Sequence, residues 1–382
     1  LPSDTYFKKG VNIQVFIGQM QHNFILTDVM KTGDHHSYEQ FISSHSLPDQ
    51  TFEYTGEYYT LHNYDLEKYD RRLALIDMRI HNNRLIENPG YQKDLSTRLE
   101  LLHQQGFKFI VANPWESKDN IKSQIFVTGE KMKKVDIPYP YHLWTGDISW
   151  FWNYMYHKHK DNKFNFTHDH DGHFWFKKHE FLYLNKAVRS HRTKLYNRLL
   201  KDNVLENSIY TFVNMKPSRR LPKEYELPGI DPKDYPRWGK DQDITEAPYI
   251  DTVCSIVSET NDNDYEVFMT EKIWKPIMAQ HVFVVHGNYL YLQALREAGF
   301  RTFGSYFDES YDLERDSDKR IDKIANLCKE LRTINWQDLY LQTQALRKHN
   351  YDTLFNKQKL SEQINKTLGL FLEFADSSEI SS

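Results

Sequence analysis

The feature that most constrains the fold of this chain is the alternation of short apolar runs with segments of helical periodicity. In the second half, the apolar runs lie at 181–185 (FLYLN), 208–213 (SIYTFV), 252–260 (TVCSIVSET) and 282–285 (VFVV). Helical patterns lie at about 190–200, from 271 onward and at about 289–298. Strands that alternate with helices form parallel sheets, since each helix returns the chain to the start of the next strand. The second half therefore predicts a Rossmann-like α/β domain.

The first half shows the same alternation less completely. Its apolar runs lie at 11–17, 73–80 and 107–113. A helical pattern from about 91 to 105, which ends at Gly106, separates the last two of these runs. An aromatic and histidine-rich stretch at 144–173 has no clear period, and we expect the domain boundary there. We therefore predict two Rossmann-like α/β domains that face a cleft, at 1–165 and 166–350, with a helical C-terminal tail at 351–382.

The composition is that of a folded, soluble protein. Aromatic residues make up 15% of the chain, which is enough to build a core, and the mean hydropathy is −0.73. The formal charge of −4 argues against a surface built throughout for nucleic acid, although it leaves room for a local basic cleft. Cys254 and Cys328 are far apart, which argues against a disulfide framework and favours a reducing compartment. No apolar run is long enough to span a bilayer, so we expect a cytoplasmic protein.

A basic cluster follows the first strand of the second domain. From Lys186 to Lys201 the chain holds basic residues and no acid, and Arg189 and Arg192 lie where the helix begins. Ligands bind at the carboxyl ends of parallel strands, and the free N–H groups of helix N-termini favour anions there. A guanidinium also matches phosphate oxygens with a planar pair of donors. We therefore predict a diphosphate site at Arg189 and Arg192, and a solvated helix face for Arg198 and Lys201.

A second charged motif begins the helix after the strand at 252–260, in the sequence FMTEK. Thr270 is the predicted N-cap, Glu271 can accept hydrogen bonds from both hydroxyls of a ribose, and Lys272 can bind phosphate. The plainer interpretation of Glu271 is an acid in the first turn, where the helix dipole favours it. Further along, Gly287 follows a strand and is expected to let the backbone approach a ligand closely.

Together these residues resemble the nucleotide-binding signature of α1,3-fucosyltransferase-type enzymes, over about 181–312. That family is metal-independent and inverting, and it adopts the two-domain GT-B fold. The resemblance implies that Arg192 and Lys272 bind the diphosphate and that Glu271 binds the ribose. It also implies donor-site roles for Glu259, as the loop carboxylate, and for Phe268, as the aromatic residue. The first domain would then bind the acceptor.

The chain departs from that family pattern at three positions. Ser258 and Thr260 stand where the family has Phe and Asn, and Phe268 stands where it has Tyr. The donor nucleotide therefore stays open between GDP-linked and UDP-linked sugars. The runs at 295–303 and 308–312 are also similar to uncharacterised glycosyltransferase-like proteins of phages and giant viruses.

An inverting transferase needs a general base that takes the proton of the acceptor hydroxyl. Glu116 follows a predicted strand end in ANPWES and is the leading candidate, ahead of Asp147 and Asp77. Its alternative interpretation is an acid in the first turn of a helix.

Two further clusters leave alternatives open. The six residues His168–His173 (HDHDGH) include metal-ligand types, but they lie in the predicted linker, whereas catalytic ligands usually come from separate elements. We therefore predict no required metal. The second cluster consists of four aromatic residues, Trp144, Trp150, Phe151 and Trp152. Their rings either stack on sugar and base faces or fill the domain interface.

The sequence thus predicts a glycosyltransferase that moves a sugar from a nucleotide-sugar to a hydroxyl of a glycan or small acceptor, with no further cofactor. One alternative is a viral enzyme that glycosylates a hydroxymethyl pyrimidine of DNA in the host cytoplasm. Its candidate DNA contacts are the basic stretches at 157–163 and 216–220. The other alternative is a catalytically inactive protein that binds a nucleotide or a glycan.

Overall fold

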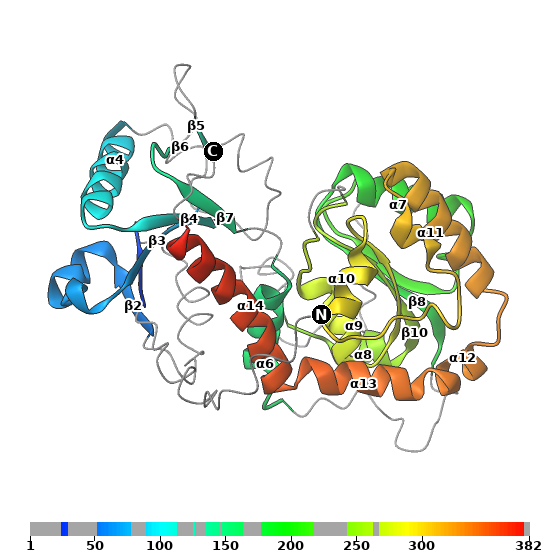
Figure 1. The fold of residues 1–382 in the computed structure, drawn as a ribbon. Coiled ribbons are helices and arrows are strands. Elements are labelled where there is room, and N and C mark those ends of the chain that lie inside the picture. The colour runs from blue at the N-terminus through cyan, green and yellow to red at the C-terminus, as the bar shows by residue number, and fades with distance from the viewer. Residues whose placement is uncertain are drawn as a thin grey trace, which may run out of the picture. The chain divides into compact units, whose positions relative to one another are not determined.

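The described part of the chain forms two compact units, each built on its own parallel sheet (Figure 1). The computed structural model describes residues 24–29, 52–77, 89–112, 125–126, 135–144, 147–162, 177–216, 243–262 and 267–377. One unit comprises Leu1–Thr145 with Ile364–Ser382, and the other comprises Gly146–Gln363. The predicted α/β class with parallel sheets is confirmed in both units.

The first unit contains a parallel sheet with the strand order β2-β1-β3-β4-β7. Its strands are β1 (Phe24–Asp28), β2 (Phe52–Glu57), β3 (Arg71–Asp77), β4 (Lys108–Ala112) and β7 (Tyr141–Trp144). The winding of the chain reverses between β1 and β3, as in open doubly wound sheets. Three smaller features complete the unit: η2 (Tyr58–Asn63), η3 (Leu66–Lys68) and the paired strands β5 (Ile125–Phe126) and β6 (Val135–Asp136). The strand predicted at 11–17 lies outside the described residues.

Helix α4 (Pro89–Gln104) matches the helix predicted at 91–105 and covers the core of the first unit. Leu95, Leu99 and Leu102 are buried, and their spacing places them on one face of the helix. Gly106 adopts a φ of +79° just after the helix, and the N–H of Phe107 donates to the carbonyl of Leu102 at 3.0 Å. This left-handed glycine ends the helix as the sequence predicted.

The end of helix α14 (Lys357–Asp376) belongs to the first unit. Nζ of Lys108 donates to the main-chain oxygens of Ala375 and Ser377 at 2.6 Å each. Arg71 binds both carboxylate oxygens of Asp376, at 2.6 and 2.7 Å. Cations at a helix C-terminus satisfy carbonyls that have no partner within the helix. The described part of the predicted tail at 351–382 is therefore mainly helical, and the end of α14 is bound by residues of β3 and β4.

The second unit contains a parallel sheet with the strand order β11-β10-β8-β9. Its strands are β8 (His179–Asn185), β9 (Ser208–Phe212), β10 (Thr252–Ser258) and β11 (Val282–His286). Every residue of β10 and β11 is buried. Strands that helices cover on both faces have continuous apolar runs, which is why these segments show no alternation in the sequence.

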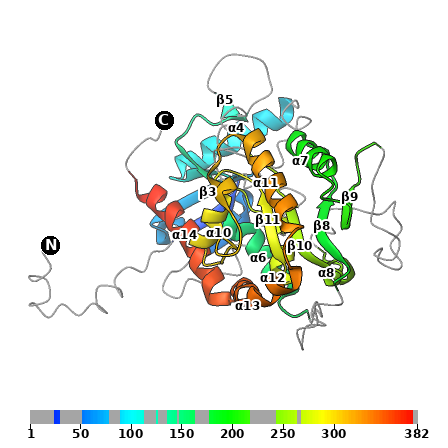
Figure 2. The ribbon, with the colours of Figure 1, turned by 90° about the vertical axis from the view of Figure 1, so that its right-hand side faces the viewer.

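Helices cover both faces of this sheet. Helix α7 (Ser190–Lys201) packs beside α11 (Ser317–Leu331) (Figure 2). Helix α9 (Glu271–Met278) packs with α6 (Ile148–His159) and α13 (Gln344–Leu354). The connections β8–α7–β9 and β10–α9–β11 run in opposite directions along the sheet. Because such crossovers are right-handed, α7 and α9 lie on opposite faces. The remaining elements are α8 (Glu246–Ile250), α10 (Tyr291–Glu297), η7 (Ser310–Leu313) and α12 (Trp336–Gln342).

The aromatic residues of α6 form part of the core of the second unit. Trp152 is fully buried, and its ring centroid lies 5.8 Å from that of Trp274 and 4.9 Å from that of Phe300. Its Nε1 donates to the main-chain oxygen of Leu354 at 2.8 Å. Trp150 and Phe151 are buried too. These rings therefore pack inside the second unit, although the predicted boundary at 165 assigned them to the first domain. Trp144 packs against Phe371 within the first unit.

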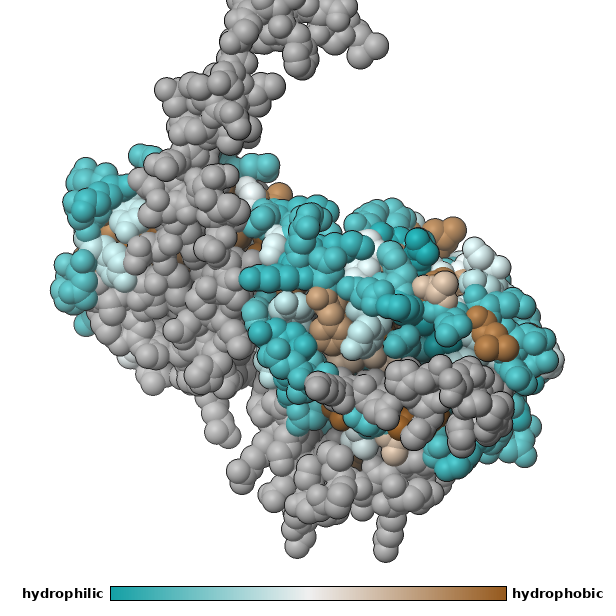
Figure 3. Space-filling model, turned by 90° about the horizontal axis from the view of Figure 1, so that it is seen from below, coloured by the Kyte–Doolittle hydropathy of each residue, from teal (hydrophilic) through white to brown (hydrophobic). Residues whose placement is uncertain are grey.

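Among the described helices, none is both long and apolar enough to cross a bilayer. On the face seen in Figure 3, the coloured residues are mainly hydrophilic and the hydrophobic patches are small and separate. Cys254 and Cys328 are buried and free.

Replacement of Trp152 tests the packing of α6. We expect Trp152→Ala to lower the free energy of unfolding by about 3–5 kcal/mol, because it leaves a cavity between two aromatic rings. Trp152→Phe keeps a ring but loses the hydrogen bond to Leu354 and part of the buried volume, so its cost should be smaller, about 1–2 kcal/mol. Urea unfolding followed by fluorescence and circular dichroism measures both. Equal stability of the alanine variant and the wild type would contradict this packing.

Candidate functional site

The predicted ligand-binding residues gather at the carboxyl edge of the second sheet, between β8 and β10. The chain leaves β8 toward β9 on one side, whereas β10 and β11 lie on the other side, so the winding reverses here. Helices α7 and α9 begin at this edge, at Ser190 and Glu271. Open α/β sheets bind ligands at such a reversal point, and helix N-termini there present free N–H groups.

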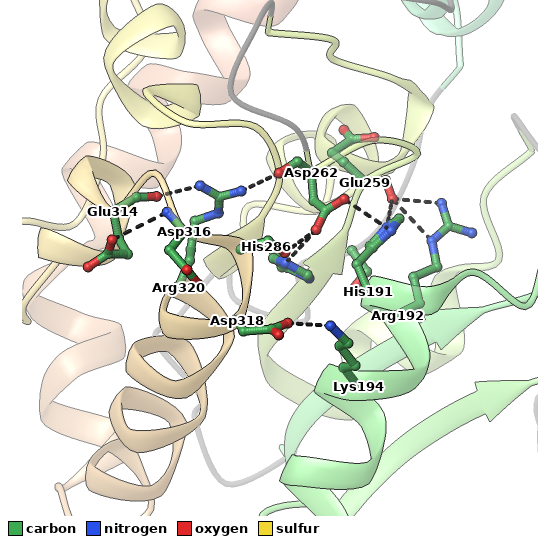
Figure 4. A network of polar contacts seen from close by, with 12 residues as sticks. His191, Arg192, Lys194, Glu259, Asp262, His286, Glu314, Asp316, Asp318 and Arg320 are labelled. Carbon is green, nitrogen blue, oxygen red and sulfur yellow. Dashed lines mark hydrogen bonds and ion pairs between the residues drawn. The ribbon is translucent and has the colours of Figure 1, made fainter.

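Arg192 is buried at this edge and is held by the main chain of the loop that follows β10. Its Nε and Nη2 donate to the carbonyl oxygen of Glu259, at 3.1 and 2.8 Å (Figure 4). The described residues supply no hydrogen-bond partner for its third nitrogen, Nη1. The guanidinium is therefore fixed in orientation while one N–H₂ group stays available to a ligand.

Arg189 supplies a second guanidinium, which is exposed. It is the N-cap residue of α7, and its side chain makes no capping hydrogen bond. Burial lowers the pKa of Arg192, and the neighbouring charge of Arg189 lowers it further. The two cations repel each other, so a bound anion would be favoured because it relieves that repulsion.

The carboxylate of Glu259 is buried and holds the loop together. Oε1 accepts hydrogen bonds from the N–H of Thr270 at 3.1 Å and from the hydroxyl of Tyr291 at 2.7 Å. Oε2 accepts from Oγ1 of Thr270 at 2.5 Å and from the N–H of Thr260 at 3.2 Å. Glu259 is 0% exposed. Its carboxylate therefore positions the starts of α9 and α10, whereas the resemblance had implied a place at the donor.

The start of α9 carries an ion pair next to its cap. Oγ1 of Thr270 accepts from the N–H of Lys272 at 3.4 Å, which confirms the predicted N-cap. Nζ of Lys272 donates to Oε1 of Glu271 at 2.7 Å and to Oγ1 of Thr270 at 3.1 Å. Burial raises the pKa of Glu271, but the charges of Lys272 and Lys275 outweigh it and the pKa is lowered. Glu271 is therefore an anion that can accept hydrogen bonds from hydroxyl groups.

Phe268 and Gly287 contact other parts of the protein rather than open space. The N–H of Phe268 donates to Oδ1 of Asn288 at 3.0 Å, and its buried ring packs against Phe151. A Cβ built on Gly287 would lie 2.5 Å from Cδ2 of Tyr291. The close approach that Gly287 allows in this structure is to this ring, and the contact with a ligand expected from the sequence stays a prediction.

The structure also brings together three residues that the sequence analysis did not combine. Nδ1 of His191, in the first turn of α7, lies 3.3 Å from Oδ1 of Asp262. Nε2 of His286, the last residue of β11, lies 3.9 Å from Oδ2 of the same carboxylate. The two imidazole rings meet edge to face, with centroids 5.4 Å apart. Each residue follows the carboxyl end of a strand of this sheet, a pattern that could have identified them.

Several predicted residues lie elsewhere. Glu116, the cluster His168–His173 and most of 216–220 fall outside the described residues. Asp147 is the N-cap of α6, where its Oδ1 accepts from the N–H and hydroxyl of Ser149 at 2.7 and 2.6 Å. Asp77 is the last residue of β3. Within the described ranges, no group of three or more His, Cys, Asp or Glu residues is arranged to hold a metal ion.

Comparisons with known proteins establish no family for the chain. No protein-family model matches it, and no curated protein matches it significantly. A crystal structure of an α1,3-fucosyltransferase with GDP-fucose aligns with a TM-score of 0.41 and 12% identity, over 95% of this chain and 93% of that one. A second crystal structure of an α1,3-fucosyltransferase aligns with a TM-score of 0.41 and 12% identity, over 94% and 90% of the two chains.

The contact between Gly287 and Tyr291 gives a prediction. We expect Gly287→Ala to lower the free energy of unfolding by about 1–3 kcal/mol, because the added methyl group overlaps the ring. Gly369→Ala is the control, since nothing lies within 4 Å of a Cβ there, and it should stabilise α14 by about 0.5–1 kcal/mol. Chemical unfolding measures both variants. Wild-type stability of Gly287→Ala combined with lost nucleotide affinity would restore the ligand-contact interpretation.

Proposed function

We propose that the protein is a glycosyltransferase and that the edge between β8 and β10 binds its nucleotide-sugar donor. The observation that carries this proposal is the convergence of two helix N-termini with Arg189, Arg192 and Lys272 beside the carboxylate of Glu271. A nucleoside diphosphate needs cations and N–H donors for its phosphates and an acceptor for its ribose. One edge of one sheet supplies all three.

The proposed chemistry is a single displacement with inversion that does not require a metal. When the bond between sugar and phosphate breaks, negative charge grows on the departing diphosphate. Cations that are held in place beforehand stabilise that charge without reorganisation. Arg192 meets this condition, because two of its nitrogens are fixed on the Glu259 carbonyl and the third faces no described partner.

Glu271 and Lys272 divide the remaining contacts between ribose and phosphate. Glu271 is ionised and partly accessible, with 13% of its side chain exposed, so it can accept from the ribose hydroxyls. Lys272 is 25% exposed and can turn from Glu271 toward a phosphate oxygen. Thr270 and Glu259 support these two residues from within the protein. The nucleotide, GDP or UDP, stays open.

The acceptor and the general base are assigned to the first unit. Glu116 stays the candidate base. Asp147 is less suited, because its carboxylate is occupied as a helix cap. Asp77 is an alternative by position, since it ends β3 next to β1, where the winding of the first sheet reverses.

The described residues do not favour the DNA-modifying alternative. In the basic stretch at 157–163, Lys158 pairs with Asp243 at 2.5 Å and Lys160 pairs with Asp161 at 3.4 Å. Lysines that already have acidic partners gain less from phosphate contacts. An inactive binding protein is the remaining alternative, and a turnover measurement separates it from a transferase.

Nucleotide binding tests the proposed site. We expect GDP- or UDP-linked sugars to raise the melting temperature of the wild type, and Arg189→Ala to weaken their binding about 10–100-fold through loss of a charged hydrogen bond. Lys194→Ala is the matched control on α7, because Lys194 is half exposed and pairs with Asp318. Arg192→Lys tests the buried position while it retains the charge.

These binding measurements, together with a turnover assay, can each contradict the proposed function. If no GDP-, UDP-, CDP- or ADP-linked sugar binds, or if Arg189→Ala binds as well as Lys194→Ala, the site is misplaced. Release of free nucleotide that depends on an acceptor identifies a transferase. Tight binding with no release under any acceptor condition would identify the inactive alternative.

The proposed contact between Glu271 and the ribose can be tested with a nucleotide that lacks the ribose hydroxyls. We expect the wild type to prefer a ribonucleoside diphosphate over its 2′,3′-dideoxy form by about tenfold, the equivalent of one or two hydrogen bonds to a charged group. Glu271→Gln keeps the size of the side chain and should remove most of that preference. Calorimetric titration of both nucleotides measures the ratio. An unchanged ratio in the variant would show that Glu271 does not contact the ribose.

A further inference from the structure

His191 occupies a position that its neutral form cannot fully satisfy. Its Nε2 lies 3.1 Å from the main-chain oxygen of Glu259, and its Nδ1 lies 3.3 Å from Oδ1 of Asp262 (Figure 4). Both partners are hydrogen-bond acceptors. A neutral imidazole has one N–H, whereas the imidazolium has two. Only the protonated ring therefore donates to both partners at once.

The surroundings of His191 oppose that protonation when no ligand is bound. Burial lowers its pKa; Asp262 and the Glu259 carbonyl act in the opposite direction, and Arg192 and Arg189 add to the lowering. The ring of His286, the last residue of β11, faces His191. Burial holds the pKa of His286 well below its usual value, so this ring is neutral. The two acceptors thus favour a protonated His191, whereas burial, together with the charges of Arg192 and Arg189, disfavours it.

Asp262 cannot follow a change at His191, because α11 holds it. The hydroxyl of Ser317 donates to Oδ2 of Asp262, and the guanidinium of Arg320 donates to its main-chain oxygen. Arg320 is buried and also binds the main-chain oxygen of Glu314 (Figure 4). His191 therefore has a fixed carboxylate on one side and a fixed carbonyl on the other. That same carbonyl is the one that orients Arg192.

We propose that binding of the anionic donor at Arg189 and Arg192 is coupled to uptake of a proton by His191, which then ties α7 to the loop after β10 as a positioning residue. This inference rests on the proposed donor site. A diphosphate neutralises the two guanidiniums, and the imidazolium can then form beside Asp262. The protonated ring strengthens the hold on the Glu259 carbonyl, and through it the orientation of Arg192.

The linkage has a definite sign. The pKa of His191 is higher in the complex with the donor than in the free protein. At a pH between these two pKa values, the complex therefore holds more protons than the free protein. Affinity for the donor therefore rises as the pH falls through that window, by about tenfold for each unit of difference between the two states. Above the higher of the two pKa values, His191 is neutral in the free protein and in the complex, and the affinity for the donor is at its lower limit.

The test uses two anions that do not themselves titrate near neutral pH, a UDP- or GDP-linked sugar and sulfate. Calorimetric titration in buffers of different ionisation enthalpy gives the number of protons taken up on binding. We expect the wild type to take up a substantial fraction of one proton near pH 7, and His191→Gln to take up none. His286→Gln is the control and should keep the uptake, because His286 is not the group that titrates.

Asp262→Asn provides a sharper variant. An asparagine amide can donate to Nδ1 of a neutral His191, so both ring nitrogens are satisfied without a proton. We expect this variant to bind the nucleotide-sugar with an affinity that changes less than about twofold between pH 6 and 8, against about tenfold in the wild type. A role that is only structural would weaken binding in this variant without removing its pH dependence.

The outcomes separate this inference from the proposed function. Proton uptake with sulfate but no binding of any nucleotide-sugar would keep the coupling between anion binding and His191 and overturn the assignment of the anion as a nucleotide-sugar. Binding of either anion by the wild type without proton uptake would overturn the inference and leave the donor site in place. Failure of both anions to bind would overturn both.

Discussion

The carboxyl edge of the second sheet depends on one buried residue, Glu259. Its carboxylate accepts hydrogen bonds from Thr260, Thr270 and Tyr291, and its carbonyl accepts them from His191 and Arg192. A carboxylate that is removed from water needs such partners, since an uncompensated buried charge is very costly. The same partners join β10 to the starts of α7, α9 and α10. Glu259 therefore links the starts of α9 and α10 through its carboxylate and the start of α7 through its main-chain carbonyl.

That arrangement keeps the charges of the site apart in two layers. Glu259 is buried inside the protein, whereas Arg189 is exposed and Lys272 is partly exposed beside Glu271. A protein with a formal charge of −4 can thus present a local positive site to a diphosphate. At the proposed site, Arg192 is held in place by the Glu259 carbonyl, so its electrostatic contribution would require little reorganisation.

The two sheets share one winding pattern. In each sheet, the first two strands along the chain are neighbours. The later strands are added beside the first strand, on the side away from the second. Such a sheet has a reversal point at its carboxyl edge, and in the second unit the charged residues gather there. In the first unit, the strands that border the reversal are β1 and β3, which end at Asp28 and Asp77. The carboxylates at these strand ends are consistent with the proposal that this unit binds the acceptor.

The sequence by itself determined the elements of this protein: the apolar runs of β8 to β11, the glycine that ends α4 and the threonine that caps α9. These features arise from periodicity and from contacts a few residues apart, so they can be read without the fold. Only the tertiary structure decided that Gly287 accommodates Tyr291, that Glu259 and Phe268 point inward, that α6 belongs to the second unit, and that His191 meets Asp262. Gly287 and Tyr291 are only four residues apart, but the other contacts join partners distant in the chain, and the order of the strands, rather than any local pattern, brings such partners together.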